Sequence, residues 1–461
     1  MRTRGLSNDD GKQTSRTAKF IVVMLTTIPI VATIAYGAVD TLALGILFVL
    51  SSLIVMLRVA DAWKVGQLPL SSDMIQLPLI GLIAIGCIQL LPLAGSDPAV
   101  PALAAPASQA LSLDPYGTRF FVLHLIIYLI FFSSALVYVQ GGRRLNSIAA
   151  TIVIFGAALA FFGILQRLSI PDAIYGLRET PQAIPFGPFV NQHHFAALML
   201  MTSGVALGLL FGSGAGRERK IFVALAAGIM GMAIVFTGSR GGLIGFLFVV
   251  AFAAVTSFVR KRDEAGNDDD DAIGTRARNM LVVGAAGLLV LFVAASVLFL
   301  GGQDSLLRGI GLQYSQDDVT SGRLHFWGVA WQIFLGNPVL GAGLNSFGVA
   351  FSHFDTWNGR FRVENAHNDY FQMLADGGVL GFACVAIFVV LLLKRGITAI
   401  GNRSDGLRRS IVVGAMAGCV GILVHSFLDF PLRTPANAFV FLLLVALIAS
   451  NAKPERRRRS H

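Results

Sequence analysis

The chain has 461 residues, of which 55% are hydrophobic and only 13% are charged, and its formal net charge is +10. A soluble protein carries about 25% charged residues, so this composition excludes a soluble globular protein, and the abundance of apolar residues excludes a disordered one. Apolar runs of about 20 residues are long enough to cross a bilayer as helices. Such runs recur along the chain and predict an all-α, polytopic integral membrane protein with about twelve transmembrane helices. The predicted spans are residues 18–36, 40–57, 75–94, 118–139, 147–166, 192–212, 220–236, 241–259, 279–300, 377–393, 410–428 and 436–450.

The basic residues predict the orientation of these helices, because cytoplasmic loops carry an excess of Lys and Arg. With the N-terminus inside, 27 of the 36 Lys and Arg residues fall in cytoplasmic segments and 9 on the other side. Both termini are therefore predicted to be cytoplasmic, and the basic charge indicates topology rather than a nucleic-acid partner. The run Arg456–Arg459 is expected to face anionic membrane lipid. All nine outer basic residues are Arg, whose planar fork suits phosphate oxygens.

The loops differ on the two sides of the predicted membrane. On the inner side, residues 263–271 carry an acidic run that we interpret as a solvated loop, with its role left open. On the outer side, residues 301–376 form the longest loop, and residues 322–335 within it read as an amphipathic, interfacial helix. No phosphate-binding loop of the G-x-x-x-x-G-K-[ST] type occurs. Any chemistry is therefore expected on the outer face, with a substrate that is already activated.

The densest polar cluster runs from Glu364 to Tyr370, just before the tenth predicted span. If a helix begins here, Glu364 and His367 are three residues apart and share a face, whereas Asp369 points elsewhere. A histidine can act as a general base near neutral pH, so the cluster predicts a catalytic or binding site. A zinc site is disfavoured, because Cys ligands and H-x-x-x-H spacing are absent here, and no metal is expected. The alternative is a structural histidine in a loop.

Three further clusters lie at the outer ends of predicted spans. Arg240 occupies a tight loop between the seventh and eighth spans, where a nearly intramembrane Arg usually has a partner such as phosphate. Two adjacent histidines open the sixth span and point about 100° apart, so only one is expected to face the outer cavity. His425 and Asp429 close the eleventh span four residues apart and can pair, either for structure or for function.

These residues together resemble the O-antigen ligase-like family of polysaccharide ligases and polymerases. The resemblance covers most of residues 185–432 and rests on the order and spacing of several short motifs. They are Asn191-x-x-His194, Ser239-Arg240-Gly241, Arg323 followed by Trp327, Asn337-Pro338 with Gly341-x-Gly343, Ala366-His367-Asn368-Asp369-Tyr370, and Gly377-Gly378-x-x-Gly381.

The resemblance implies a bacterial inner-membrane glycosyltransferase whose active face is periplasmic. Such enzymes move a glycan from undecaprenyl pyrophosphate to an acceptor hydroxyl, on lipid A-core for ligases or on another glycan for polymerases. It implies that Arg240 and Arg323 bind the donor pyrophosphate, that Arg433 is a further candidate for that role, and that His367 activates the acceptor. Glu364 would hold the imidazole, by our own inference from its spacing. Further polar candidates for the site are Asn191, His194, Asn368 and Asp369.

The expected reaction is a metal-independent, inverting displacement that needs no cofactor. We expect one transmembrane domain over residues 1–461, with residues 301–376 periplasmic, and possible contacts with polysaccharide-assembly proteins. Two alternatives belong to other classes. A membrane transporter would place its binding groups near the bilayer midplane, commonly in internal repeats, and no half-to-half repeat is found. A non-catalytic subunit of an assembly complex would not need the His367 cluster.

Overall fold

The computed structural model describes residues 15–93, 109–181, 183–212, 216–264, 322–356, 363–401 and 406–452, and this part of the chain is almost entirely helical. Ten of the described helices are long and apolar enough to cross a membrane, which confirms the all-α, multi-pass class. They are α1 (Arg16–Ile34), α2 (Thr41–Val65), α4 (Pro115–Tyr138), α5 (Gly142–Ser169), α6 (Gln192–Phe211), α7 (Arg217–Phe236), α8 (Arg240–Glu264), α13 (Asp369–Gly401), α14 (Gly406–His425) and α15 (Pro435–Ala452).

Two of the twelve predicted spans fall outside this set. The third is the shorter helix α3 (Leu77–Gln89), preceded by the 3-10 turn η2 (Met74–Gln76). Its 13 residues rise about 20 Å, which is less than the hydrocarbon core of about 30 Å. The ninth, residues 279–300, lies outside the described residues, as does most of the acidic loop 263–271.

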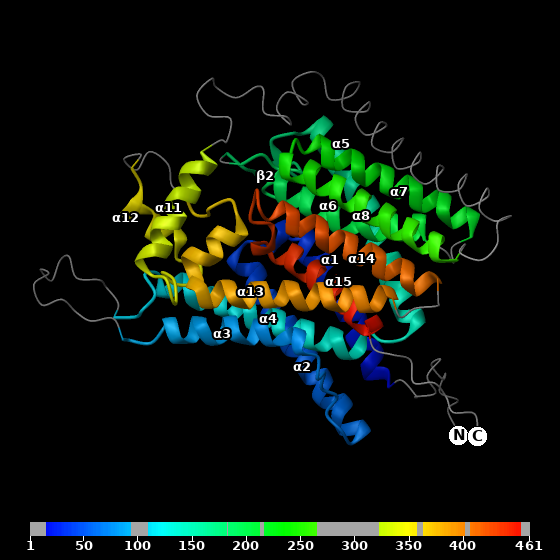
Figure 1. Cartoon of the computed structure of the whole chain (residues 1–461), viewed down its shortest axis with the longest axis horizontal. Coiled ribbons are helices and arrows are strands. Elements are labelled where there is room, and N and C mark those ends of the chain that lie inside the picture. Colours follow the sequence, from blue (N-terminus) through cyan, green and yellow to red (C-terminus); the bar gives the residue numbers. More distant parts are fainter. Residues whose placement is uncertain are drawn as a thin grey trace, which may run out of the picture.

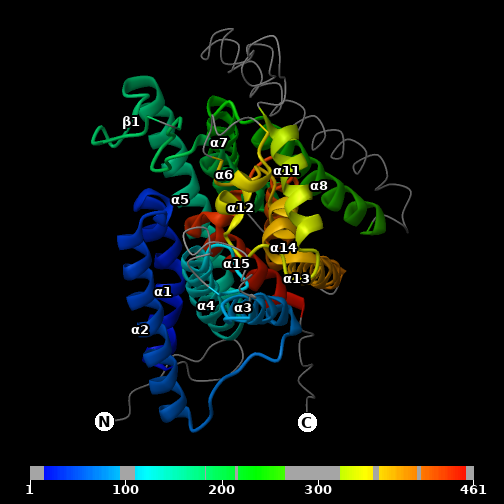
Figure 2. The same cartoon turned by 90° about the vertical axis from the view of Figure 1, so that its left-hand side faces the viewer.

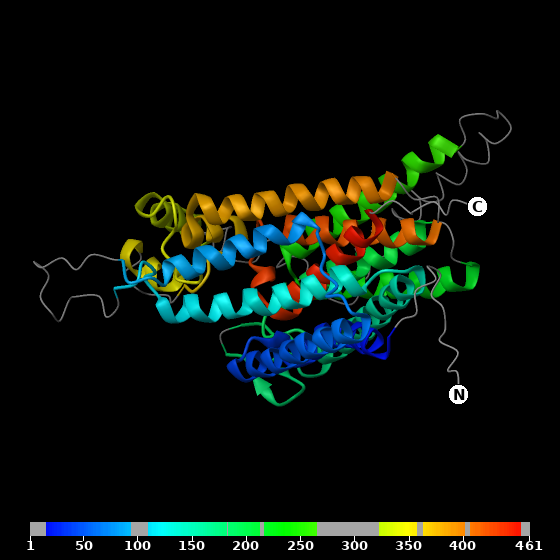
Figure 3. The same ribbon diagram turned by 90° about the horizontal axis from the view of Figure 1, so that it is seen from below.

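The long helices run roughly along one axis of the molecule (Figures 1 and 3), and two short helices, α11 (Arg323–Gly336) and α12 (Phe347–Phe354), cap one end. We call this the site end. It gathers the start of α6, the start of α8, the start of α13 and the end of α14. On one flank, α1 and α2 pack side by side (Figure 2). The 3-10 turn η1 (Tyr36–Ala38) joins them, and the hairpin of β1 (Ala173–Ile174) and β2 (Arg178–Glu179) is tied there by an ion pair of 2.6 Å between Arg178 and Asp40.

Glycines bring α6 and α14 into direct backbone contact. A Cβ atom on Gly208 would lie 2.3 Å from the Gly414 nitrogen, and one on Gly204 would lie 2.4 Å from the Gly418 nitrogen. Small residues four apart allow this close approach of membrane helices. Helix α8 joins them in the same way, because a Cβ on Gly245 would lie 2.9 Å from a carbonyl of α14. The three helices therefore meet the site end at fixed positions relative to one another.

Helix α13 is broken near the site end. Gly378 has φ 62° and ψ −162°, a conformation that only glycine adopts readily. The segment after α11 fills the break with backbone hydrogen bonds, since the amides of Ala342 and Gly343 donate to the carbonyls of Ala375 and Asp376. The amide of Val379 in turn donates to a carbonyl of that segment. The cap formed by α11 and α12 is thereby attached to the start of α13.

Candidate functional site

His367 and Asp429 form the centre of the candidate site. The Nδ1 atom of His367 lies 3.3 Å from Oδ1 of Asp429, and the two side chains are 31% and 1% exposed. Burial alone would raise the pKa of Asp429. The charge of His193 and the contact with His367 outweigh burial and hold this pKa well below its usual range. Asp429 is therefore an ionised carboxylate that can stabilise positive charge on the His367 ring.

The backbone of His367 is held in an unusual conformation. Its φ of 51° is left-handed, which costs a residue other than glycine about 1–2 kcal/mol. Asn368 offsets this cost, because its side chain accepts the amides of Tyr370 and Phe371 and donates to a carbonyl at the end of α14. Asp369 adds a bond of 2.8 Å from the Ser426 hydroxyl. Asn368 and Asp369, both predicted site candidates, thus position His367 against the end of α14.

The two histidines that open α6 have different surroundings. His194 is buried and packs into the protein, where its Nδ1 lies 2.7 Å from the hydroxyl of Thr434 and its ring meets that of Phe430 at 4.9 Å. Phe430 also meets the His367 ring at 4.9 Å, so it lies between the two imidazoles. Asn191 caps α6 by accepting the amide of His193. The predicted candidates Asn191 and His194 therefore shape the site rather than line it.

His193, not His194, faces the cluster. Its Nδ1 lies 2.9 Å from the hydroxyl of Ser239 and 3.9 Å from Oδ2 of Asp429. It also interacts electrostatically with Arg240, Arg323 and His367. The sequence left open which of the two histidines faces the outer cavity, and only His194 was named as a site candidate. The glycines of α6 and α14 could have indicated it. Gly204 contacts Gly418, and an equal number of residues from each glycine toward the site end leads to His193 on one segment and Asp429 on the other.

Arg240 and Arg323 are half-buried and stand at the starts of α8 and α11. Both act on His193, so the structure brings them to the same site although they are far apart in the sequence. A helix start favours anions, and two guanidinium groups add to that preference. This arrangement can hold a pyrophosphate.

Arg433 has protein partners on both terminal nitrogens. One donates to Asn345 at 3.0 Å and the other to Asp376 at 2.6 Å, and the guanidinium lies 5.3 Å from the centre of the Phe121 ring. It belongs to the 3-10 turn η3 (Pro431–Arg433). The side chain thereby connects η3 to the broken part of α13.

Two further predicted contacts concern carboxylates. Glu364 is exposed, and the carboxylate that lies against His367 in the described residues is Asp429. The predicted pairing of His425 with Asp429 is not a side-chain hydrogen bond, because neither ring nitrogen of the fully buried His425 has a hydrogen-bond partner in the described part of the chain. Asp429 faces His367 and His193 instead.

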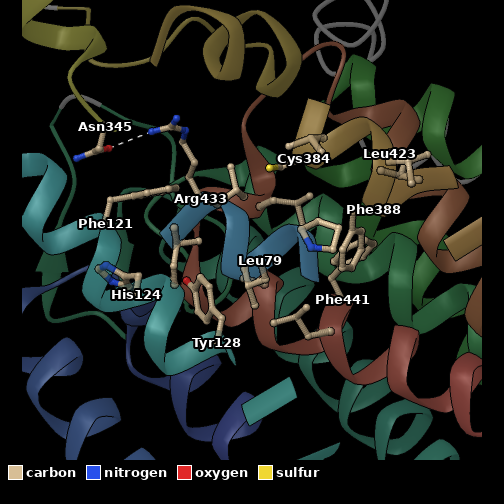
Figure 4. Close-up of a pocket in the computed structure, with 18 of the residues that line it drawn as sticks. Leu79, Phe121, His124, Tyr128, Asn345, Cys384, Phe388, Leu423, Arg433 and Phe441 are labelled. Carbon is tan, nitrogen blue, oxygen red and sulfur yellow. Dashed lines mark hydrogen bonds between the residues drawn. The ribbon is translucent and has the colours of Figure 1, made fainter. Parts of the chain in front are cut away.

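An apolar cavity of about 270 Å³ lies among α3, α4, α13, α14 and α15 (Figure 4). Its walls include Leu79, Phe388 and Phe441, and Arg433 and Asn345 stand at one end. The same short segment after α14 thus contributes Asp429 to the site and Arg433 to the cavity. The cavity suits a hydrocarbon chain better than a sugar, because so few polar groups line it.

Comparison with known proteins supports the family prediction. The family model described as O-antigen ligase matches residues 225–386, which lie inside the predicted region 185–432. The matched segment contains Arg240, Arg323, Glu364 and His367 but ends before Asp429. No curated protein matches the chain. Over this segment the match confirms the predicted resemblance to the O-antigen ligase family, and it supports a ligase- or polymerase-type function in general.

Proposed function

We propose that this multi-pass membrane protein, which carries an O-antigen ligase domain at residues 225–386, transfers a glycan from undecaprenyl pyrophosphate to an acceptor hydroxyl. The observation that carries the proposal is the gathering of a base, a buried carboxylate and two arginines at one end of the bundle. These are His367, Asp429, Arg240 and Arg323. The excess of Lys and Arg in the opposite loops supports a periplasmic site on a bacterial inner membrane.

In the proposed reaction, His367 takes the proton of the acceptor hydroxyl on its Nε2 atom. Asp429 orients the ring through Nδ1 and stabilises the imidazolium that forms, which is the role first predicted for Glu364. A general base of this kind contributes roughly 10²–10⁴ in rate. The hydroxyl oxygen then attacks the anomeric carbon from the face opposite the departing pyrophosphate, so the configuration inverts, with no metal required by the proposal.

Arg240 and Arg323 are proposed to bind the pyrophosphate and to stabilise the charge that grows on it as it leaves. Donors fixed in advance in this way are worth about 3–4 kcal/mol each. We assign Arg433 to positioning the segment η3 rather than to donor binding, because both terminal nitrogens of its guanidinium already donate to Asn345 and Asp376.

The apolar cavity is proposed to accept part of the undecaprenyl chain. A cavity of about 150 Å³ holds benzene, so one of about 270 Å³ holds a hydrocarbon segment of about ten carbons, or two isoprene units. Arg433 stands at one end of the cavity, and Asp429 of the candidate site lies a few residues before it in the same segment. The chain of the donor would enter from the lipid while its pyrophosphate meets the arginines.

The acceptor is proposed to be the core of lipid A, which makes the protein a ligase, and polymerisation onto another glycan is the alternative within the same chemistry. Deletion of the gene separates the two. Loss of a ligase leaves long polymer on the lipid carrier, whereas loss of a polymerase leaves single repeats on the acceptor.

Purified protein in nanodiscs, supplied with donor and acceptor, tests the transfer itself. His367→Gln should lower the rate by at least about 10², whereas His353→Gln, an exposed histidine of α12, should leave it unchanged. No transfer to either acceptor by the wild-type protein would refute the proposed function.

A further inference from the structure

His193 occupies a position that mirrors that of His367. Each imidazole presents its Nδ1 to a different oxygen of Asp429, at 3.3 Å for His367 and 3.9 Å for His193. The two side chains are 31% and 23% exposed. One carboxylate therefore lies against two partly exposed rings.

The ring of His193 is fixed more firmly than its exposure suggests. The Ser239 hydroxyl lies 2.9 Å from Nδ1 and itself accepts the amide of Gly242, so it is held at the start of α8. At the other end of the side chain, the amide of His193 is bound by the cap residue Asn191. The orientation of Nε2 is thus set by α6 and α8 together.

Charged groups act on His193 from four different segments of the chain. Asp429 is the negative one, from the segment after α14. The positive ones are Arg240 from α8, Arg323 from α11 and His367 ahead of α13, with the buried rings of His194 and His425 close by. A pyrophosphate bound by the two arginines would offset their charge and favour a proton on His193.

We propose that His193 is a second catalytic histidine, which donates a proton from Nε2 to the pyrophosphate oxygen that leaves the anomeric carbon. This inference rests on the proposed function. His367 and His193 would then act as base and acid on opposite sides of the reacting carbon, with Asp429 between them. The distinction from His194 is geometric, because Thr434 holds the Nδ1 of His194 inside the protein.

The proton and electron count balances. The O–H bond of the acceptor breaks and its proton goes to Nε2 of His367, while the acceptor oxygen bonds to the anomeric carbon. The bond from that carbon to the phosphate oxygen breaks, its electron pair stays on the oxygen, and His193 supplies the proton. Exchange with water then returns both rings to their starting states.

The test is the dependence of kcat on pH for glycan transfer in nanodiscs, since kcat reports the groups of the donor complex, with donor binding measured separately. The wild-type protein should show a bell-shaped profile, because one histidine must be neutral and the other protonated. His193→Asn keeps a polar atom near Nδ1 for Ser239 but removes Nε2. It should lower kcat about 10²-fold, lose the fall in rate on the alkaline side and bind the donor within threefold of wild type. His353→Gln should keep the whole profile.

A His193→Asn variant that keeps the alkaline limb, or transfers within threefold of the wild-type rate, would overturn the inference. If this variant does not insert, Ser239→Ala replaces it. Removing the hydroxyl from Nδ1 should shift the alkaline limb alone, and an unshifted limb would refute the role of His193. Absence of transfer by the wild-type protein would instead count against the proposed function, so the two failures are distinguishable.

Discussion

Replacing Asp429 by Asn is the perturbation that addresses the site most directly. The substitution keeps the shape of the side chain but removes the buried charge that faces His367 and His193. Because the pKa of Asp429 is held well below its usual range, the carboxylate is ionised near neutral pH. Its loss should therefore remove a full charge from the site.

The magnitude follows from the separation of the charges. Two unit charges about 4 Å apart interact by about 4 kcal/mol at an effective dielectric constant of 20. Since the His367 side chain is 31% exposed, we halve this for solvent screening to about 2 kcal/mol, or about 30-fold in rate. Loss of ring orientation adds to it, because Asn in place of the Asp behind the catalytic His of a serine protease costs about 10⁴. The expected loss in kcat/KM lies between about 30-fold and 10⁴-fold.

The assay is the initial rate of glycan transfer by purified protein, measured from pH 5 to pH 9. Asp429→Asn should lower the rate across this whole range, because the carboxylate that faces both histidines is removed. Asp40→Asn is the matched control, because it also removes a charge from an ion pair, but on the flank beside β2. A rate within threefold of wild type across this range would show that Asp429 does not act on His367.

Three other outcomes follow from the structure. Arg240→Ala should lower transfer by about 10²–10³ at normal expression, as removal of one fixed donor does, and an equal loss of insertion would assign Arg240 to folding instead. Leu79→Trp should fill the cavity and raise KM for donors with a full-length chain at least tenfold, while KM for a donor truncated to one isoprene unit stays unchanged; equal effects on both donors would exclude the cavity as a chain site. Gly208→Leu should prevent stable insertion, because its Cβ would strike the backbone of α14, whereas Gly228→Leu in α7 should be tolerated, since no atom lies within 4 Å of a Cβ built there; thermal melting in detergent compares them.

Hydropathy predicted most of the spanning helices and the multi-pass class, because apolar length alone determines whether a helix can cross a bilayer. It overestimated the length of α3, because the apolar run continues beyond Gln89, where the helix ends. Motif spacing led to Arg240, Arg323 and His367. It could not choose between His193 and His194, since neighbours on a helix differ only in direction and the choice is made by packing of α6 against α14.

Asp429 illustrates the remaining limit. It is 62 positions from His367, and their contact depends on where α14 ends and on how Asn368 binds that end. No local pattern contains this information. In the sequence, Asn368 and Asp369 look like residues that could take part in the chemistry. In the structure, their side chains accept hydrogen bonds that hold the loop in place. A polar cluster in a sequence thus mixes residues that react with residues that hold them.

The attachment of the cap to the broken part of α13 has a consequence for how such proteins diversify. Main-chain groups make this joint, between the stretch from Pro338 to Gly343 and the stretch from Ala375 to Leu380. Apart from the glycines and Asp376, which binds Arg433, side chains contribute little to the joint, so the outward faces of α11 and α12 can change with little effect on the reacting groups beneath. Under the proposed function, this scaffold would allow the acceptor to change while the chemistry stays the same.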